Sequence, residues 1–143
     1  MSKLTKEALD STDADFIKKA RGVEKGRVTR CVDQILTVLK LDESNSYDHK
    51  SISRIEVGEA EITLKEAFTN VVDLHSRYQV HRAVGTDAAE EEALENGEND
   101  YIVAVETKYH EGQKSINNYN QVGEMNHKEY LVVNEKFPAK MTN

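Results

Sequence analysis

Apolar residues recur every three or four positions along three successive stretches of this chain, and this spacing constrains the fold more than any other feature. In an α-helix, such spacing places the apolar side chains on one face as a narrow seam. A seam of this kind is stable only when another helix, or another copy of the chain, covers it. Because the chain has 143 residues, we expect one domain of packed helices.

The first periodic segment runs from residue 12 to residue 41, with apolar residues at spacings near 3.5. The apolar pattern has a gap at Arg21 and Glu24. Gly22 and Gly26 also lie in this first half, and they indicate either a softer helix start or a close approach to a partner helix. The residues expected to line the seam of this helix are Val28, Cys31, Ile35 and Val38.

Two further helices are predicted, over residues 59–83 and 88–120. The polar, turn-rich stretch 42–51 is expected to form the loop that precedes them. The residues expected to line their seams are Leu64, Phe68, Val71, Tyr78, Tyr101, Val105 and Tyr109.

Helix-capping patterns accompany these segments. Thr12 and Thr63 are each followed three residues later by an acidic residue, which matches the capping box at a helix start. Gly85 suits the position after a helix end, and Asp87 suits the start of the next helix. These signals favour a short turn between the second and third helices.

The predicted fold is all-α. We expect an elongated three-helix antiparallel hairpin, or coiled-coil-like bundle, over residues 12–120. A flexible N-terminus is expected over residues 1–11, and a poorly structured C-terminal tail over residues 121–143.

The composition suits a chain that stays inside the cell. Cys31 is the only cysteine, so a disulfide within the chain is impossible and a reducing compartment is the simplest interpretation. No apolar run approaches the roughly 20 residues that a membrane span needs, and no secretory signal is visible. We therefore expect a cytoplasmic or nuclear location and no membrane partner.

The net charge of −7 is unevenly distributed. Residues 17–31 carry six cations and one anion, whereas residues 87–106 carry eight anions and no cation. We expect the basic first helix to lie beside the acidic third helix, with surface ion pairs that set orientation more than stability. The alternative is that the cations contact the phosphates of RNA or DNA. The residues that would do so are Lys18, Lys19, Arg21, Lys25, Arg27 and Arg30.

Catalytic and metal-binding patterns are weak in this sequence. The spacing of the glycines does not complete a phosphate-binding loop, and the five histidines match no zinc-protease pattern. Cys31 lies on an apolar seam, where a lone cysteine is usually a small core residue rather than a nucleophile. We therefore expect no enzymatic activity, no cofactor and no metal site.

One short pattern resembles a known family. The segment Lys25-Gly26-Arg27-Val28-Thr29-Arg30 is similar to a motif in the N-terminal helical region of Gag polyproteins from BEL/Pao-type LTR retrotransposons. The order of elements is similar over residues 14–119, with a helix that begins like Leu64 to Ala67 and an acidic helix like Glu90 to Tyr109. The chain departs from the family in having no capsid-like core, no cysteine knuckle, and no protease or polymerase signature. The resemblance implies self-association into a Gag-like assembly, with RNA nearby.

The predicted function is that of a structural or assembly module that forms a homo-oligomer through its helical seams. One alternative is a helical adaptor that binds another helical protein. Another is a weak nucleic-acid-binding module that uses the basic first helix.

Overall fold

The computed structural model describes residues 2–42 and 47–136, with side chains for residues 2–40 and 54–121. Within these ranges the chain forms four α-helices and no strand, so the predicted all-α class is confirmed. The predicted number of helices was three, and the fourth is a short helix at the N-terminus. The helices are α1 (Lys3–Leu9), α2 (Ala14–Asp42), α3 (Tyr47–His81) and α4 (Ala88–Lys136).

Helix α1 occupies the segment that was predicted to be a flexible N-terminus. Ser2 caps it, because the Ser2 hydroxyl accepts a hydrogen bond of 3.2 Å from the backbone N–H of Thr5. Thr5 and Ala8 are buried against the longer helices. Seven residues are too few to form a stable helix alone, so this tertiary burial holds α1 in place.

Helix α2 begins close to its predicted start but with a different cap. The carboxylate of Asp13 accepts hydrogen bonds from the backbone N–H groups of Asp15 and Phe16, at 3.1 and 3.4 Å. Asp13 is therefore the capping residue, one position after the expected Thr12.

Helix α3 begins at Tyr47, twelve residues before the predicted start at Glu59. The Thr63 side chain does not cap a helix start as predicted. It lies inside α3, and its hydroxyl donates to the backbone carbonyl of Glu59, one turn earlier, at 3.3 Å. Residues 43–46 of the predicted loop lie outside the described residues.

Helix α4 begins as predicted and ends later than predicted. The carboxylate of Asp87 accepts a 2.8 Å hydrogen bond from the backbone N–H of Glu90, which confirms Asp87 as the N-cap. Gly85 does not form a left-handed C-cap, since no described glycine has a positive φ. The helix continues to Lys136, so residues 121–136 are helical rather than a poorly structured tail. Residues 137–143 of that tail lie outside the described ranges.

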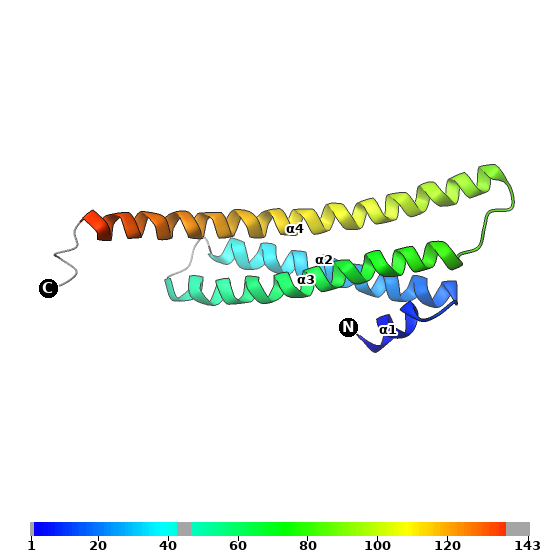
Figure 1. Cartoon of the computed structure of the whole chain (residues 1–143), viewed down its shortest axis with the longest axis horizontal. Coiled ribbons are helices and arrows are strands. Elements are labelled where there is room, and N and C mark those ends of the chain that lie inside the picture. The colour runs from blue at the N-terminus through cyan, green and yellow to red at the C-terminus, as the bar shows by residue number, and fades with distance from the viewer. Residues whose placement is uncertain (1, 43–46, 137–143) are drawn as a thin grey trace.

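The three long helices lie side by side along the length of the molecule (Figure 1). Helices α2 and α3 form an antiparallel hairpin, and α4 runs along it in the direction opposite to α3. Helix α1 packs against the end of this hairpin where α2 begins. None of the helical segments in residues 2–42 and 47–136 has a stretch long and apolar enough to cross a membrane.

The predicted seams meet in the interior of this single chain. Every one of the eleven seam residues is buried or partly buried in a hydrophobic core. Ten belong to the main cluster between α2, α3 and α4, and Tyr78 packs on a second cluster beneath α1. The seams are thus covered by each other within one molecule, which is one of the two solutions that the sequence allowed.

Gly112 allows α4 to approach the hairpin closely at the centre of the main core. A Cβ atom at this position would lie 2.8 Å from Val32 Cγ2 and 3.3 Å from Leu64 Cδ2. By contrast, a Cβ at Gly22 would meet nothing within 4 Å, and one at Gly26 would meet only the Arg30 side chain. The close approach suggested for Gly22 and Gly26 therefore does not occur among the residues that the structure describes.

The last turns of α4 extend beyond the hairpin (Figure 1). Phe68 stacks on Tyr109 at a ring-centroid distance of 4.0 Å, and Gln113 donates to Glu61 at 2.8 Å, which sets the register of α3 against α4. On this register, Tyr47 at the start of α3 lies level with about residue 129 of α4. Residues 130–136 therefore continue past the start of α3.

Candidate functional site

A buried polar cluster joins α2, α3 and α4 at the gap in the first seam. The Arg21 side chain is only 3% exposed. Its Nη1 donates to Glu98 Oε2 of α4 at 2.5 Å and lies 3.0 Å from His75 Nδ1 of α3. Gln79 Nε2 also donates to Glu98 Oε2, at 3.2 Å. One carboxylate of α4 is thus held by both helices of the hairpin.

Two tyrosine rings enclose the Arg21 guanidinium. Its Cζ lies 3.9 Å from the ring centroid of Tyr101 and 4.6 Å from that of Tyr78. Lys25 Nζ lies 4.6 Å from the Tyr101 centroid as well. Cation–π contacts of this kind are worth about 0.5–2 kcal/mol, and more when they are shielded from water. The rings therefore offset part of the cost of burying the Arg21 charge.

Burial affects the titration of the groups around Arg21. Desolvation, followed by the charge of Arg21, holds the pKa of His75 below its ordinary value of 6.5, while Glu98 and Glu106 act in the opposite direction. Burial raises the pKa of the Tyr101 phenol, although Arg21 opposes this effect. Both groups are therefore neutral at pH 7.

A second buried charge lies one turn further along α2. The Glu24 side chain is fully buried, and its carboxylate accepts hydrogen bonds from Thr5 Oγ1 at 2.6 Å and from Arg27 Nη1 at 2.8 Å. Arg27 Nη1 also lies 3.9 Å from Glu66 Oε1 of α3. The hydrogen bond between Thr5 and Glu24 therefore holds α1 against the bundle.

The predicted cationic stripe is divided by these contacts. Arg21 is buried, Arg27 is paired with Glu24, and Lys25 lies against Tyr101. Lys18, Lys19 and Arg30 are exposed. The structure therefore buries one of the six predicted nucleic-acid contacts, engages two half-buried ones in contacts within the protein, and leaves three on the surface of α2.

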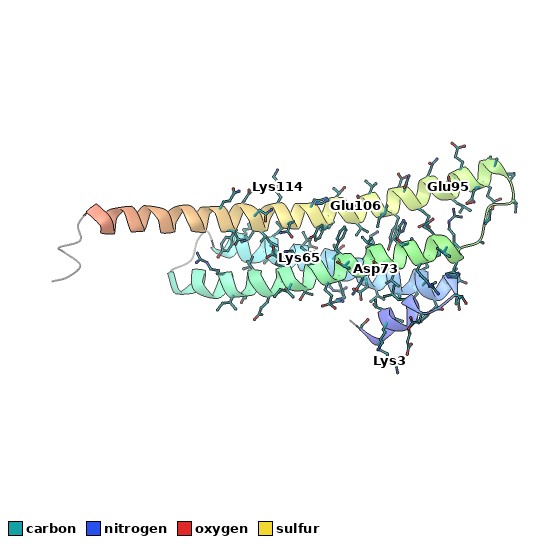
Figure 2. The ribbon with its side chains drawn as sticks, viewed as in Figure 1. Lys3, Lys65, Asp73, Glu95, Glu106 and Lys114 are labelled. Atoms are coloured by element: carbon teal, nitrogen blue, oxygen red, sulfur yellow. The ribbon has the colours of Figure 1, made fainter. Side chains whose placement is uncertain are left out.

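The acidic segment lies beside the basic segment, as predicted, but the main link is not a surface pair. Arg21–Glu98 is largely buried, at 3% and 17% side-chain exposure. Nearer the start of α4, Glu91 accepts from Arg82 at 2.5 Å and from the backbone N–H of Gly85 at 3.1 Å, and these two hydrogen bonds lower the pKa of Glu91. Figure 2 shows charged side chains such as Glu95 along α4.

Cys31 is a core residue of the main cluster. Desolvation raises the pKa of its thiol above the ordinary value of 9.0, and the nearby Arg27 and Arg30 only partly oppose this. The thiol is therefore protonated at pH 7 and packs as a small apolar side chain, which is how the sequence was interpreted.

No functional role was predicted from the sequence for His75, Glu98, Gln79 or Thr5. The available signal was the gap in the apolar pattern at Arg21 and Glu24, because both residues lie on the buried face of α2. A polar residue on a buried face needs a partner, so the gap indicated a polar site. The identity of the partners depended on how three helices pack.

No group of three or more histidine, cysteine or acidic residues within residues 2–42 and 47–136 is arranged to hold a metal ion. Comparisons with protein-family models, with curated proteins and with solved structures find no match to this chain. The resemblance to the retrotransposon Gag region therefore stays a prediction from the sequence pattern.

Proposed function

We propose that this chain is a non-enzymatic helical assembly module that associates with a second copy of itself through the end of α4. The observation that carries the proposal is the extension of residues 130–136 past the start of α3 (Figure 1). This segment begins with the apolar sequence Tyr130-Leu131-Val132-Val133. No helix in the described part of the chain runs beside it, and we infer that a second copy covers it.

The burial of the seams supports the end of α4 as the surface for association. All eleven seam residues already pack within one chain, so they are not available to a second copy unless the bundle opens. Burying a valine or leucine side chain contributes about 1.5–3 kcal/mol. Association at the end of α4 gains this energy without disrupting the core.

A second copy is the simplest partner, because each copy supplies the same segment. Two such segments can meet around a two-fold axis, which is the commonest symmetry of protein oligomers. The resemblance to a Gag region, which implies self-association, supports the same proposal.

Sedimentation velocity over a range of protein concentrations tests the proposal. We expect the full chain and a chain ending at residue 136 to associate as concentration rises, and a chain ending at residue 129 to stay monomeric. Leu131→Asp is expected to weaken association in the full chain. Val103→Asp is the matched control, because Val103 is a 54% exposed residue of the same helix.

A full chain that stays monomeric at every concentration would contradict self-association and favour the adaptor alternative. Nucleic-acid binding is a separate alternative that would use the exposed Lys18, Lys19 and Arg30. Binding of single-stranded RNA that weakens steeply with salt and disappears when all three become alanine would favour that alternative.

A further inference from the structure

Two exposed isoleucines lie on one face of α3, towards the end of the molecule where α4 projects (Figure 1). Ile55 and Ile62 are 62% and 71% exposed, and their spacing of seven residues places them on the same side of the helix. Gly58 lies between them, and a Cβ atom there would meet nothing within 4 Å. We call Ile55, Gly58 and Ile62 the isoleucine patch. The exposed Glu59 borders this patch, because it follows Ile55 by four residues and precedes Ile62 by three.

The segment that follows α4 has the chemistry to match this patch. Residues 137–143 lie outside the described residues, and their sequence is Phe-Pro-Ala-Lys-Met-Thr-Asn. Phe137 and Met141 are apolar, and Lys140 is the only cation of the segment. Apolar side chains next to a cation complement an apolar patch bordered by the Glu59 carboxylate.

Within one chain, this segment is too short to cover the patch. Because residue 129 of α4 is level with the start of α3, Lys136 lies about 10 Å past Tyr47. Ile62 lies fifteen residues further along α3, which places it about 33 Å from Lys136 along the helix axes. A fully extended segment of seven residues spans at most about 25 Å.

In a second copy, the same segment is close enough. Where two α4 ends meet around a two-fold axis through residues 130–133, residue 136 of one copy is level with about residue 127 of the other. The α3–α4 register set by Phe68 and Gln113 makes that level correspond to about residue 49 of α3. From there, Ile55 is about 9 Å away along α3 and Ile62 is about 20 Å away, both within the reach of seven residues.

We propose that residues 137–143 of one copy bind the isoleucine patch of the second copy. Phe137 and Met141 cover the two isoleucines, and Lys140 pairs with Glu59. The inference rests on the proposed association through the end of α4 and adds a second contact to that same interface. Because the contact forms twice around the two-fold axis, it strengthens the association that the end of α4 provides.

Sedimentation velocity over a range of concentrations tests the contact with four proteins. Two are the full chain and the chain ending at residue 136, and the other two are the same chains with both Ile55→Asp and Ile62→Asp. We expect the full chain to have a dissociation constant at least about tenfold lower than the shorter chain, since burial of even one large apolar side chain is worth that much. The double substitution should abolish this difference and leave the shorter chain unchanged.

The outcomes distinguish this contact from the proposed function. A full chain that stays monomeric at every concentration would contradict association through α4, and the contact with it. Full and shorter chains that associate equally would overturn only the binding of residues 137–143 and would leave the patch to a different protein. Equal weakening of both chain lengths by the double substitution would show that something other than residues 137–143 covers the patch, which would also overturn the proposal.

Val80→Asp is the matched control for the patch. Val80 is 74% exposed and lies eighteen residues after Ile62, or five helical turns along the same face of α3, so its substitution should leave the full chain unchanged. Phe137→Ser together with Met141→Ser tests the segment without altering the described bundle. We expect this variant to associate like the chain ending at residue 136. Association as tight as that of the parent chain would overturn the proposal.

Discussion

The Thr5 hydroxyl of α1 donates a 2.6 Å hydrogen bond to the Glu24 carboxylate of α2, and both side chains are fully buried. A buried carboxylate is costly unless all of its hydrogen-bonding capacity is used. The Ser2 hydroxyl donates to Thr5 Oγ1 at 3.0 Å, which extends the chain of hydrogen bonds to the cap of α1. The docking of α1 is therefore coupled to the burial of a charge in the bundle.

Thr5→Val keeps the shape of this side chain and removes its hydroxyl. We expect the free energy of unfolding to fall by about 1–3 kcal/mol, because Glu24 loses a buried hydrogen-bond donor. Thr69→Val on the exposed face of α3 is the matched control and should change stability far less. Urea denaturation followed by circular dichroism measures both, and equal effects of the two substitutions would rule out a special role for Thr5.

Tyr101 allows the ring and the hydroxyl to be tested separately. Its hydroxyl is buried without a hydrogen-bond partner among the described residues, whereas its ring contacts the Arg21 guanidinium. We expect Tyr101→Phe to be neutral or stabilising, and Tyr101→Leu to destabilise by about 1–2 kcal/mol through loss of the cation–π contact. Thermal unfolding ranks the stabilities of the two variants. A larger loss of stability in Tyr101→Phe than in Tyr101→Leu would contradict the stabilising role of the ring.

Gly112 and Gly97 provide a matched pair in α4. Gly97→Ala adds a methyl group that meets nothing within 4 Å. Because alanine lowers the backbone entropy of the unfolded chain, we expect the folded protein to become more stable by about 0.5–1 kcal/mol. Gly112→Ala places its methyl group against the stiff side chain of Val32 and should destabilise by about 1–3 kcal/mol. Chemical denaturation compares the stabilities of the two variants with that of the parent chain. Stabilisation by both substitutions would show that α4 does not pack closely at Gly112.

Stability should fall in weak acid because of His75. Its folded pKa lies below the unfolded value of 6.5, so the unfolded chain binds the proton more readily. The stabilisation from a neutral His75 is complete above pH 6.5 and is lost as pH falls through the folded pKa. We expect the parent chain to lose more stability between pH 7.5 and 5.0 than His75→Gln does, as measured by urea denaturation. Parallel pH profiles for the two proteins would contradict this.

The helical seams could be predicted because helix periodicity is local in sequence. Ile35, Leu64 and Val105 lie in the core as expected, since each continues a regular apolar pattern. Helix α1 could not be predicted in the same way, because it is short and is held by the buried Thr5–Glu24 contact with a distant helix. The extension of α4 beyond residue 120 was missed because the apolar pattern weakens there, although weak amphipathicity does not end a helix.

The polar site was predictable only in part. The gap at Arg21 and Glu24 was visible, and so were the opposite charges of the basic and acidic segments. The sequence could not show that Glu98, among eight anions, would meet Arg21, because that choice depends on the register of α4 against the hairpin. A buried partner also differs in kind from the surface ion pairs that were expected.

Inter-chain distance measurements decide whether two copies of the chain meet at the end of α4. A single spin label is placed at Lys136 in one sample and at Glu95 in another, in full chains that carry Cys31→Ala. We expect a short inter-chain distance for the label at Lys136 and none for the label at Glu95. An inter-chain distance seen only with the label at Glu95, or with neither label at high protein concentration, would contradict it.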